Sequence, residues 1–384
     1  MRTTVRSQGG GLRGKLGVLL AVLIVTASVI YSGATGNGVA FAALLSAKAA
    51  MPQAAMTGSS ESEDKAGVSD ALNPPSAVNR EQKSNDTPAV LLPSFSPLAA
   101  IPEDIASLMK EAEAMYAAFE KSGSITERQY GAGEASSVYE NIAVRSSSAT
   151  HSINIKNELE AGTDLTVADK SKPCVLIYHT HSTEGFELID TGWYSNSYDS
   201  RTRDVGKNIV RVGQEIAAQL ENAGYKVIHD KSIYDTAYNG AYARSAEAVK
   251  AYLEKYPEIK ITLDVHRDAI KYDNGTKIKP TATVNGKKAA QVMIISGCEE
   301  GSITNFPEWR QNLRFALRLQ QACENEHAGL MRPIMFCPRR YNMNLTPWSL
   351  LVEFGTDANT LDEAAYAARL FGDALAKLLD SANV

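Results

Sequence analysis

The chain is poor in the residues that build redox and cysteine-rich metal motifs. Its 384 residues include 4 cysteines and 6 histidines. The cysteines (Cys174, Cys298, Cys323 and Cys337) are widely spaced and form no C-x-x-C pair, which excludes that class of motif. The sequence also lacks a basic stripe interleaved with aromatic residues, and its formal charge is −5. Nucleic acid is therefore excluded from the expected partners.

The composition is that of a globular protein with additional segments. Hydrophobic residues make up 44% of the chain and charged residues 22%, which is enough for a substantial core. A chain of 384 residues accommodates one large domain or two ordinary ones. The question is then which part of the chain forms the core and which part does not.

The amino-terminal segment is typical of a membrane anchor. Residues 1–15 contain four basic residues and no acidic one, and the uncharged apolar run 16–31 follows. This run approaches the ~20 residues that span a bilayer, and the basic flank predicts a cytoplasmic amino terminus. We therefore expect residues 1–33 to be a cytoplasmic tail and transmembrane anchor of a single-pass protein whose remainder is extracytoplasmic. A cleaved signal peptide ending near Ala47-Lys48-Ala49 is the alternative.

Two segments separate this anchor from the main domain. Residues 51–98 are rich in Ser, Pro, Ala, Asn and charged residues, which predicts a disordered linker. In residues 99–160, apolar positions between Ile101 and Glu120 recur at helical spacing, so an amphipathic helix is expected to dock on the domain or on a partner. Residues 121–160 are weakly patterned, and we expect an irregular segment with one short strand at 152–155.

From about residue 165 to 384, short β-rich runs alternate with helical patterns. This alternation predicts an α/β domain with a mainly parallel twisted sheet and helices on both faces. A charged hairpin-like insertion with an Asn285-Gly286 turn is expected within residues 267–288. The predicted strands are 175–178, 225–229, 259–266, 290–297, 334–337 and 349–353, and the predicted helices are 204–222, 241–255, 309–326 and 361–379.

Histidines and carboxylates follow three of these predicted strands. The first ends in His179 and His181, with Glu184 shortly after; the second ends in His266, and the third in Glu353. Residues two apart on an extended chain face the same side, so His179 and His181 are expected to face one spot. The carboxyl ends of parallel strands share an edge of the sheet, where α/β proteins bind ligands. Imidazole and carboxylate form a zinc-type ligand set, so the sequence predicts a catalytic metal site there.

The residue types also predict roles. A catalytic zinc takes three protein ligands, for which we expect His181, Glu184 and His266, and Glu353 is expected to act as general base and acid. His179 either replaces one of these ligands or acts as an orienting or oxyanion-stabilising group. Asp264 and Asp268, which flank His266, are candidates to orient its ring. His229-Asp230 is a weaker candidate for the site, and His151 and His327 are expected to be ordinary surface residues.

Several motifs together resemble the stage II sporulation protein P family. They are I-Y-H-T-H-S-T-E at 177–184, V-H-R-D at 265–268, Y-N-M-N-L-T-P at 341–347 and L-L-V-E-F-G at 350–355. The resemblance covers about residues 165–384 and implies a zinc N-acetylmuramoyl-L-alanine amidase of the amidase-3 type. By motif it assigns the metal to His181, Glu184 and His266 and catalysis to Glu353. The L-L-V-E-F-G motif departs from the expected E-V-G-G, because Phe354 follows Glu353 and Thr356-Asp357 follow Gly355.

The resemblance also implies a biological setting. Members are membrane-anchored hydrolases that cut the amide between N-acetylmuramic acid and L-Ala of peptidoglycan during forespore engulfment. Endopeptidase activity and the partners stage II sporulation proteins D and M are attributed to the family. The competing hypotheses are a zinc carboxypeptidase or pure endopeptidase, and a non-catalytic protein that binds or scaffolds the cell wall.

Overall fold

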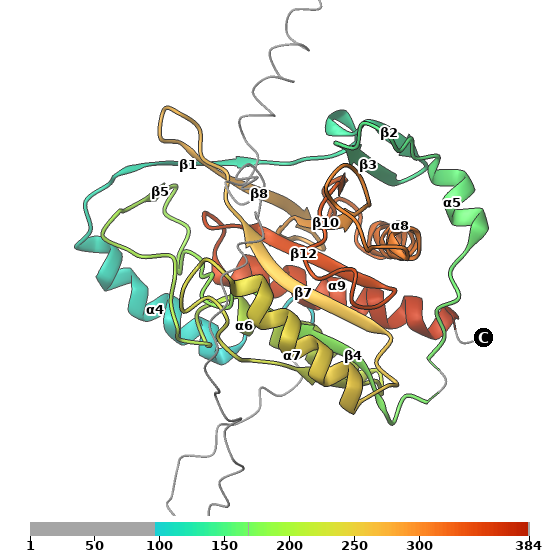
Figure 1. The fold of residues 1–384 in the computed structure, drawn as a ribbon. Helices are drawn as coiled ribbons and strands as arrows, with labels where there is room; N and C mark the ends of the chain where they lie inside the picture. The colour runs from blue at the N-terminus through green and yellow to red at the C-terminus, as the bar shows by residue number, and fades with distance from the viewer. Residues whose placement is uncertain (1–96, 168, 383–384) are drawn as a thin grey trace, which may run out of the picture. The chain divides into compact units, whose positions relative to one another are not determined.

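The computed structural model describes residues 97–167 and 169–382 (Figure 1). In this part of the chain, no helix combines the length and the apolar character that crossing a membrane requires. The predicted anchor at residues 1–33, its alternative cleavage site and nearly all of the predicted linker lie outside the described residues.

An eight-stranded mixed sheet forms the centre of the domain (Figure 1). Five of its seven strand pairs are parallel, which confirms a mainly parallel sheet. The antiparallel pairs are β10 with β12 and β2 with β3, so the sheet reverses direction between β12 and β10. In spatial order the strands are β2 (Ser137–Tyr139), β3 (Ile142–Ser146), β11 (Ile334–Cys337), β10 (Val292–Gly297), β12 (Ser349–Thr356), β7 (Ile261–Asp268), β4 (Pro173–Tyr178) and β6 (Lys226–His229).

Helices cover both faces of the sheet, as the sequence predicts. Alternate residues of β4 enter different cores: Val175 and Ile177 belong to the large core that includes the apolar residues of α6, α8 and α9. Leu176 and Tyr178 pack instead with Val249 of α7. The helices are α6 (Ile209–Asn222), α7 (Ala241–Lys255), α8 (Trp309–Glu326) and α9 (Leu361–Ala382).

The bounds of α7 and α8 agree with the prediction, whereas α6 begins five residues later than expected. Asn208 has extended backbone angles, and its side chain accepts a hydrogen bond from the Val210 amide at 2.9 Å. This is an N-cap, because it satisfies one of the amides that the first helical turn leaves without a partner. Residues 204–207 form a turn ahead of it instead of the first helical turn.

The prediction that residues 121–160 are mostly irregular is wrong. β1 (Gly123–Arg128) pairs in parallel with β8 (Lys277–Val284) within a second sheet of order β5-β1-β8-β9, and β3 joins the main sheet. Residues 152–155 do not form a strand, because Asn154 caps the helix α5 (Ile155–Ala161). β1 pairs with β8 and β3 pairs with β11, segments more than a hundred residues away, which local pattern does not reveal.

The hairpin and the amphipathic helix are confirmed. β8 and β9 (Lys287–Ala290) are antiparallel, and both Asn285 and Gly286 have positive φ (49° and 78°), as a type I′ turn requires. The helix α4 (Glu103–Ala117) docks on the domain: Arg211 Nε donates to Asp104 at 2.7 Å, and Tyr116 Oη donates to Glu187 at 2.6 Å.

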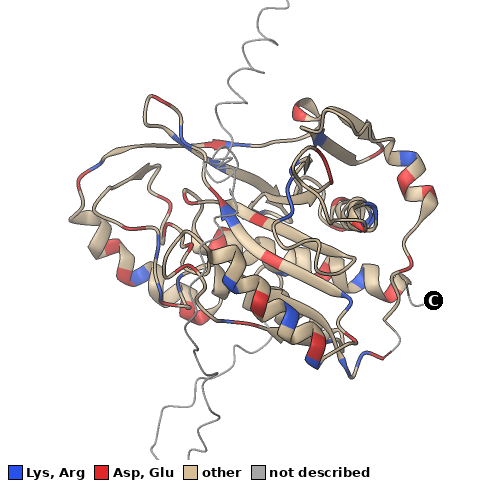
Figure 2. Ribbon diagram, viewed as in Figure 1, with Lys and Arg blue, Asp and Glu red and all other residues tan. Residues whose placement is uncertain are grey.

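Charged residues of both signs are interspersed along the helices and connecting segments (Figure 2). A few acidic residues lie instead within the central strands and are buried: Asp264 and Asp268 on β7 and Glu353 on β12. A buried carboxylate is costly unless it is paired, hydrogen-bonded or close to a cation. These positions therefore mark the part of the sheet where a functional site is expected.

Candidate metal centre

The three strand ends that carry the predicted site are neighbours. β4, β7 and β12 run parallel and adjacent, with Tyr178 paired to Asp264 and His266 paired to Glu353. The segment after β4, the end of β7 and the end of β12 therefore share one edge of the sheet. The predicted convergence of these segments is confirmed.

His181, Glu184 and His266 lie together at this edge. The rings of His181 and His266 have centroids 5.4 Å apart and meet edge to face at 87°. His266 Nδ1 lies 3.4 Å from Glu184 Oε2. All three residues are buried, with exposed fractions of 3–6%. Three side chains from two distant parts of the chain thus form one cluster with little exposure to solvent.

The Glu184 carboxylate is held in its ionised form. Its Oε2 accepts a hydrogen bond from the Arg267 amide at 3.1 Å, and its Oε1 accepts one from Arg201 at 3.4 Å. Burial alone would raise the pKa of Glu184, but the neighbouring His266 and Arg267 lower it to about 2. A carboxylate at this position is therefore ready to bind a cation.

Asp264 lies beside His266, where the sequence suggested a carboxylate that could orient the ring. His266 Nε2 lies 2.7 Å from Asp264 Oδ1. The Asp264 carboxylate in turn accepts hydrogen bonds from the Thr180 amide at 2.8 Å and the Thr180 hydroxyl at 2.7 Å. Carboxylates that contact metal-binding histidines in this way fix the ring and raise its basicity.

Unpaired buried atoms in the cluster fit a cation. His181 Nδ1 and Glu353 Oε2 are buried without a hydrogen-bond partner among the described residues, although buried polar atoms are normally paired. Two imidazoles and a carboxylate are a common set of protein ligands for catalytic zinc. The ligand atoms of His181, Glu184 and His266 do not all lie within 4.8 Å of one another, so the set is open in this structure.

Glu353 stands beside this cluster in a different electrostatic state. Burial and the nearby Asp268 carboxylate raise the pKa of Glu353 to about 8, against the opposing effect of His266. Asp268 itself pairs with Arg332 at 3.0 Å. Glu184 and Glu353 therefore have pKa values displaced in opposite directions, a pattern that separates a cation ligand from a proton carrier.

His179 is placed away from the cluster. Its Nδ1 lies 2.9 Å from the Val265 carbonyl and its Nε2 lies 2.9 Å from His229 Nε2, so both ring nitrogens have neighbours. The ring packs against Gly213 of α6. Because the chain turns after Tyr178, His179 and His181 lie in different surroundings, and the expectation that they face one spot does not hold. His229 contacts His179.

A family model described as stage II sporulation protein P (SpoIIP) matches residues 93–376. The chain belongs to the stage II sporulation protein P family.

A curated relative agrees with this membership. Stage II sporulation protein P of Bacillus subtilis is 29% identical over 219 residues, which cover 54% of this chain and 51% of that protein. The chain thus matches about half the length of this curated relative.

Solved amidase structures show low similarity to the chain. The CwlD amidase of Clostridioides difficile, solved with the GerS lipoprotein, is 13% identical with a TM-score of 0.35, covering 54% of this chain and 99% of its own. The amidase AmiC2 of Nostoc punctiforme is 17% identical with a TM-score of 0.30, covering 56% and 96%.

In this SpoIIP family member, sequence reasoning missed the residues that enclose the cluster. Tyr238 stacks on His181 with ring centroids 4.6 Å apart, and Tyr242 lies edge to face with the same ring at 5.6 Å. Asp235 Oδ2 lies 4.0 Å from His181 Nδ1 and accepts a hydrogen bond from Arg201 at 3.0 Å. The close spacing of Tyr234, Tyr238 and Tyr242 near His229 is the signal that could have revealed this aromatic cover.

The raised pKa of Glu353 predicts a pH-dependent instability of the metal-free protein. An acid whose pKa rises on folding destabilises the fold as pH rises from its unfolded pKa, near 4.5, to its folded pKa, about 8. Glu353→Gln removes this cost. With both proteins treated with chelator, the unfolding free energy of the variant at pH 8 should therefore be a few kcal/mol higher than that of wild type. The size follows because a tenfold change in a proton-binding constant is worth about 1.4 kcal/mol.

Urea unfolding from pH 4 to pH 8 measures this difference, which should vanish near pH 4. Replacement of the exposed Glu254 by Gln is the matched control and should give no such trend. A constant difference across the pH range would show that Glu353 does not change its protonation on unfolding.

Gly213 gives a test of the packing around His179. A Cβ at this position would lie 2.6 Å from His179 Cε1 and 2.9 Å from His229 Nε2. Gly213→Ala should therefore destabilise the protein by about 1–3 kcal/mol, the usual cost of overpacking a core. Gly133→Ala, where the added atom meets nothing within 4 Å, is the control. Equal urea midpoints for Gly213→Ala and wild type would contradict this packing.

Proposed function

We propose that this chain is a zinc-dependent peptidoglycan hydrolase that cuts the amide between N-acetylmuramic acid and L-Ala of the stem peptide during forespore engulfment. Membership of the stage II sporulation protein P family supports this biological setting. The observation that carries the chemistry is the meeting of His181, Glu184, His266 and Glu353 at adjacent strand ends.

The residues divide into ligands and a proton carrier. His181, Glu184 and His266 would hold zinc, which when bound polarises a carbonyl group and acidifies water. Glu353, one strand from His266, accepts a proton from the attacking water and delivers it to the leaving amide nitrogen. The C–N bond breaks as the C–O bond forms, giving a carboxylic acid on the sugar and a free amine on L-Ala. The Glu353 Oε2 atom, which has no hydrogen-bond partner among the described residues, suits a group that both takes and gives a proton.

Neighbouring residues keep these groups in place. Asp264, itself fixed by Thr180, orients His266. Arg201 pairs with both Glu184, at 3.4 Å, and Asp235, at 3.0 Å. In this scheme His179 is a positioning residue, because it bridges the Val265 carbonyl of β7 and His229 of β6 rather than reaching the reacting atoms.

The cellular setting is part of the proposal. The basic and apolar pattern of residues 1–33 favours a single-pass anchor, with the hydrolase domain extracytoplasmic and facing peptidoglycan. By family, stage II sporulation proteins D and M are the proposed partners.

A radiolabelled or tagged full chain should co-sediment with membranes and resist extraction at high salt.

Digestion of purified peptidoglycan by the zinc-loaded full chain tests the activity. Mass spectrometry of the products should show intact stem peptides with a free L-Ala amino group. Cleavage within the stem peptide alone would identify an endopeptidase instead, and removal of the terminal residue a carboxypeptidase. No release by zinc-loaded protein, alone or with proteins D and M, would favour a wall-binding scaffold.

A further inference from the structure

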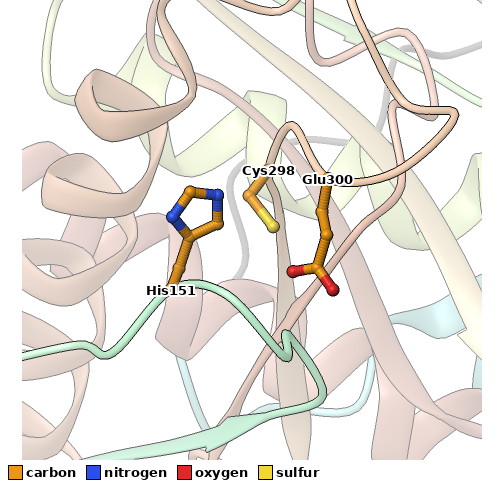
Figure 3. A group of neighbouring side chains, drawn as sticks. All are labelled: His151, Cys298 and Glu300. Atoms are coloured by element: carbon orange, nitrogen blue, oxygen red, sulfur yellow. The ribbon is translucent and has the colours of Figure 1, made fainter.

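A second cluster of metal-ligand side chains lies outside the proposed active site. His151, Cys298 and Glu300 each place a ligand atom within 4.8 Å of the other two (Figure 3). Among the described residues, this is the one group of three His, Cys, Asp or Glu that meets this spacing. Cys298 is fully buried, whereas His151 and Glu300 are partly exposed, so solvent ions can reach the cluster.

The cluster lies at the other end of the main sheet. β10 runs antiparallel to β12, with Val292 paired to Phe354 and Ile295 to Leu351, so the end of β10 lies where β12 begins. Cys298 and Glu300 follow β10 directly, and His151 follows β3, which has the same direction as β10 through β11. Glu353 lies near the opposite end of β12. The two clusters therefore do not share a substrate site.

The surroundings hold two of the three side chains in place. The Glu300 carboxylate accepts hydrogen bonds from the Ala149 amide at 3.0 Å and from the Thr150 hydroxyl at 3.0 Å. The His151 ring stacks against Trp309 with centroids 4.7 Å apart, and its Nε2 lies 2.7 Å from the Glu299 carbonyl. These contacts fix the carboxylate and the imidazole before any ion binds, as groups around metal ligands do.

We infer that His151, Cys298 and Glu300 form a second divalent-metal site, for a borderline ion such as zinc. One thiolate, one imidazole and one carboxylate are donors that zinc accepts together, and solvent completes the coordination. Binding displaces the Cys298 thiol proton, and the neutral imidazole keeps its own proton on the nitrogen that does not bind the ion, so one proton per ion is released to water. The bound ion crosslinks the segment after β3 to the segment after β10 and stabilises that end of the sheet.

Cobalt substitution distinguishes this site from the proposed active site, because only the site at His151, Cys298 and Glu300 contains a thiolate. The full chain loaded with Co²⁺ should show a near-ultraviolet thiolate-to-cobalt absorption band. Cys298→Ser should lose this band and about one equivalent of metal, whereas His266→Ala should keep the band and lose the other equivalent. His151→Gln, at a partly exposed position, should weaken Co²⁺ binding at this site at least tenfold without loss of the circular dichroism signal.

Variants of the other cysteines serve as controls for this experiment. Cys174→Ser, at the start of β4, should leave the band unchanged. Absence of the band in Co²⁺-loaded wild type would overturn the inference, and so would its persistence in Cys298→Ser with loss in Cys337→Ser. Neither result depends on hydrolase activity, so the proposed function is judged separately.

Discussion

Glu353→Gln is expected to keep its zinc and lose peptidoglycan hydrolysis by about 10²–10⁴-fold, the usual contribution of a general acid–base group. Gln has nearly the shape of Glu, but it cannot accept and return a proton. Because the Glu353 Oε2 atom has no hydrogen-bond partner among the described residues, the exchange should not disturb its neighbours. Metal content by mass spectrometry and product release from purified peptidoglycan are measured on the same sample.

Glu324→Gln is the matched control for this variant. Burial also raises the pKa of Glu324, but this carboxylate accepts hydrogen bonds from the Gly329 and Met331 amides far along the chain from the cluster. The control should hydrolyse peptidoglycan at nearly the wild-type rate. Near-normal turnover by Glu353→Gln would remove Glu353 from the reaction.

His266→Ala is expected to lower zinc affinity by more than 100-fold and to abolish hydrolysis with it. Replacing an outer residue that only orients a ligand costs about 10–100-fold in affinity, and removing a ligand should cost more. The variant also leaves Asp264 and Glu184 without the ring that lies between them. Competition with a fluorescent zinc chelator measures the affinity.

His327→Ala controls for the loss of a buried histidine. His327 pairs with Asp373 of α9 at 3.1 Å, and it is buried rather than at the surface as the sequence suggested. Its replacement should leave the affinity of the hydrolase site unchanged. The double variant His266→Ala/Cys298→Ser also lacks the second metal site. Tight zinc binding by this double variant would exclude His266 as a ligand.

The parts of the fold that sequence predicted well are those with strong local patterns. The apolar run of β4 and the periodic helices α7 and α8 specify their own structure, and Asn285-Gly286 specifies its turn. β1 was missed because four of its six residues are exposed and its stability comes from pairing with β8. The late start of α6 follows from the cap at Asn208, which competes with the helical pattern of the preceding residues.

The site was predictable to the extent that parallel strands bring their ends together. That rule placed His266 beside Glu353 and both near the segment after β4. It failed for His179, because the alternation of side chains assumes an extended chain and β4 ends at Tyr178. The stacking of Tyr238 on His181 and the cluster of His151, Cys298 and Glu300 depend on loop conformation. Neither has a periodic pattern in the sequence.

Anomalous diffraction at the zinc absorption edge, on crystals of the zinc-loaded full chain, tests the central claim most directly. The account predicts a peak bounded by His181, Glu184 and His266 at about 2.0–2.2 Å from their ligand atoms, with Glu353 beside it and unbound. Strong density at His151, Cys298 and Glu300 alone, with none at the ends of β4 and β7, would contradict it.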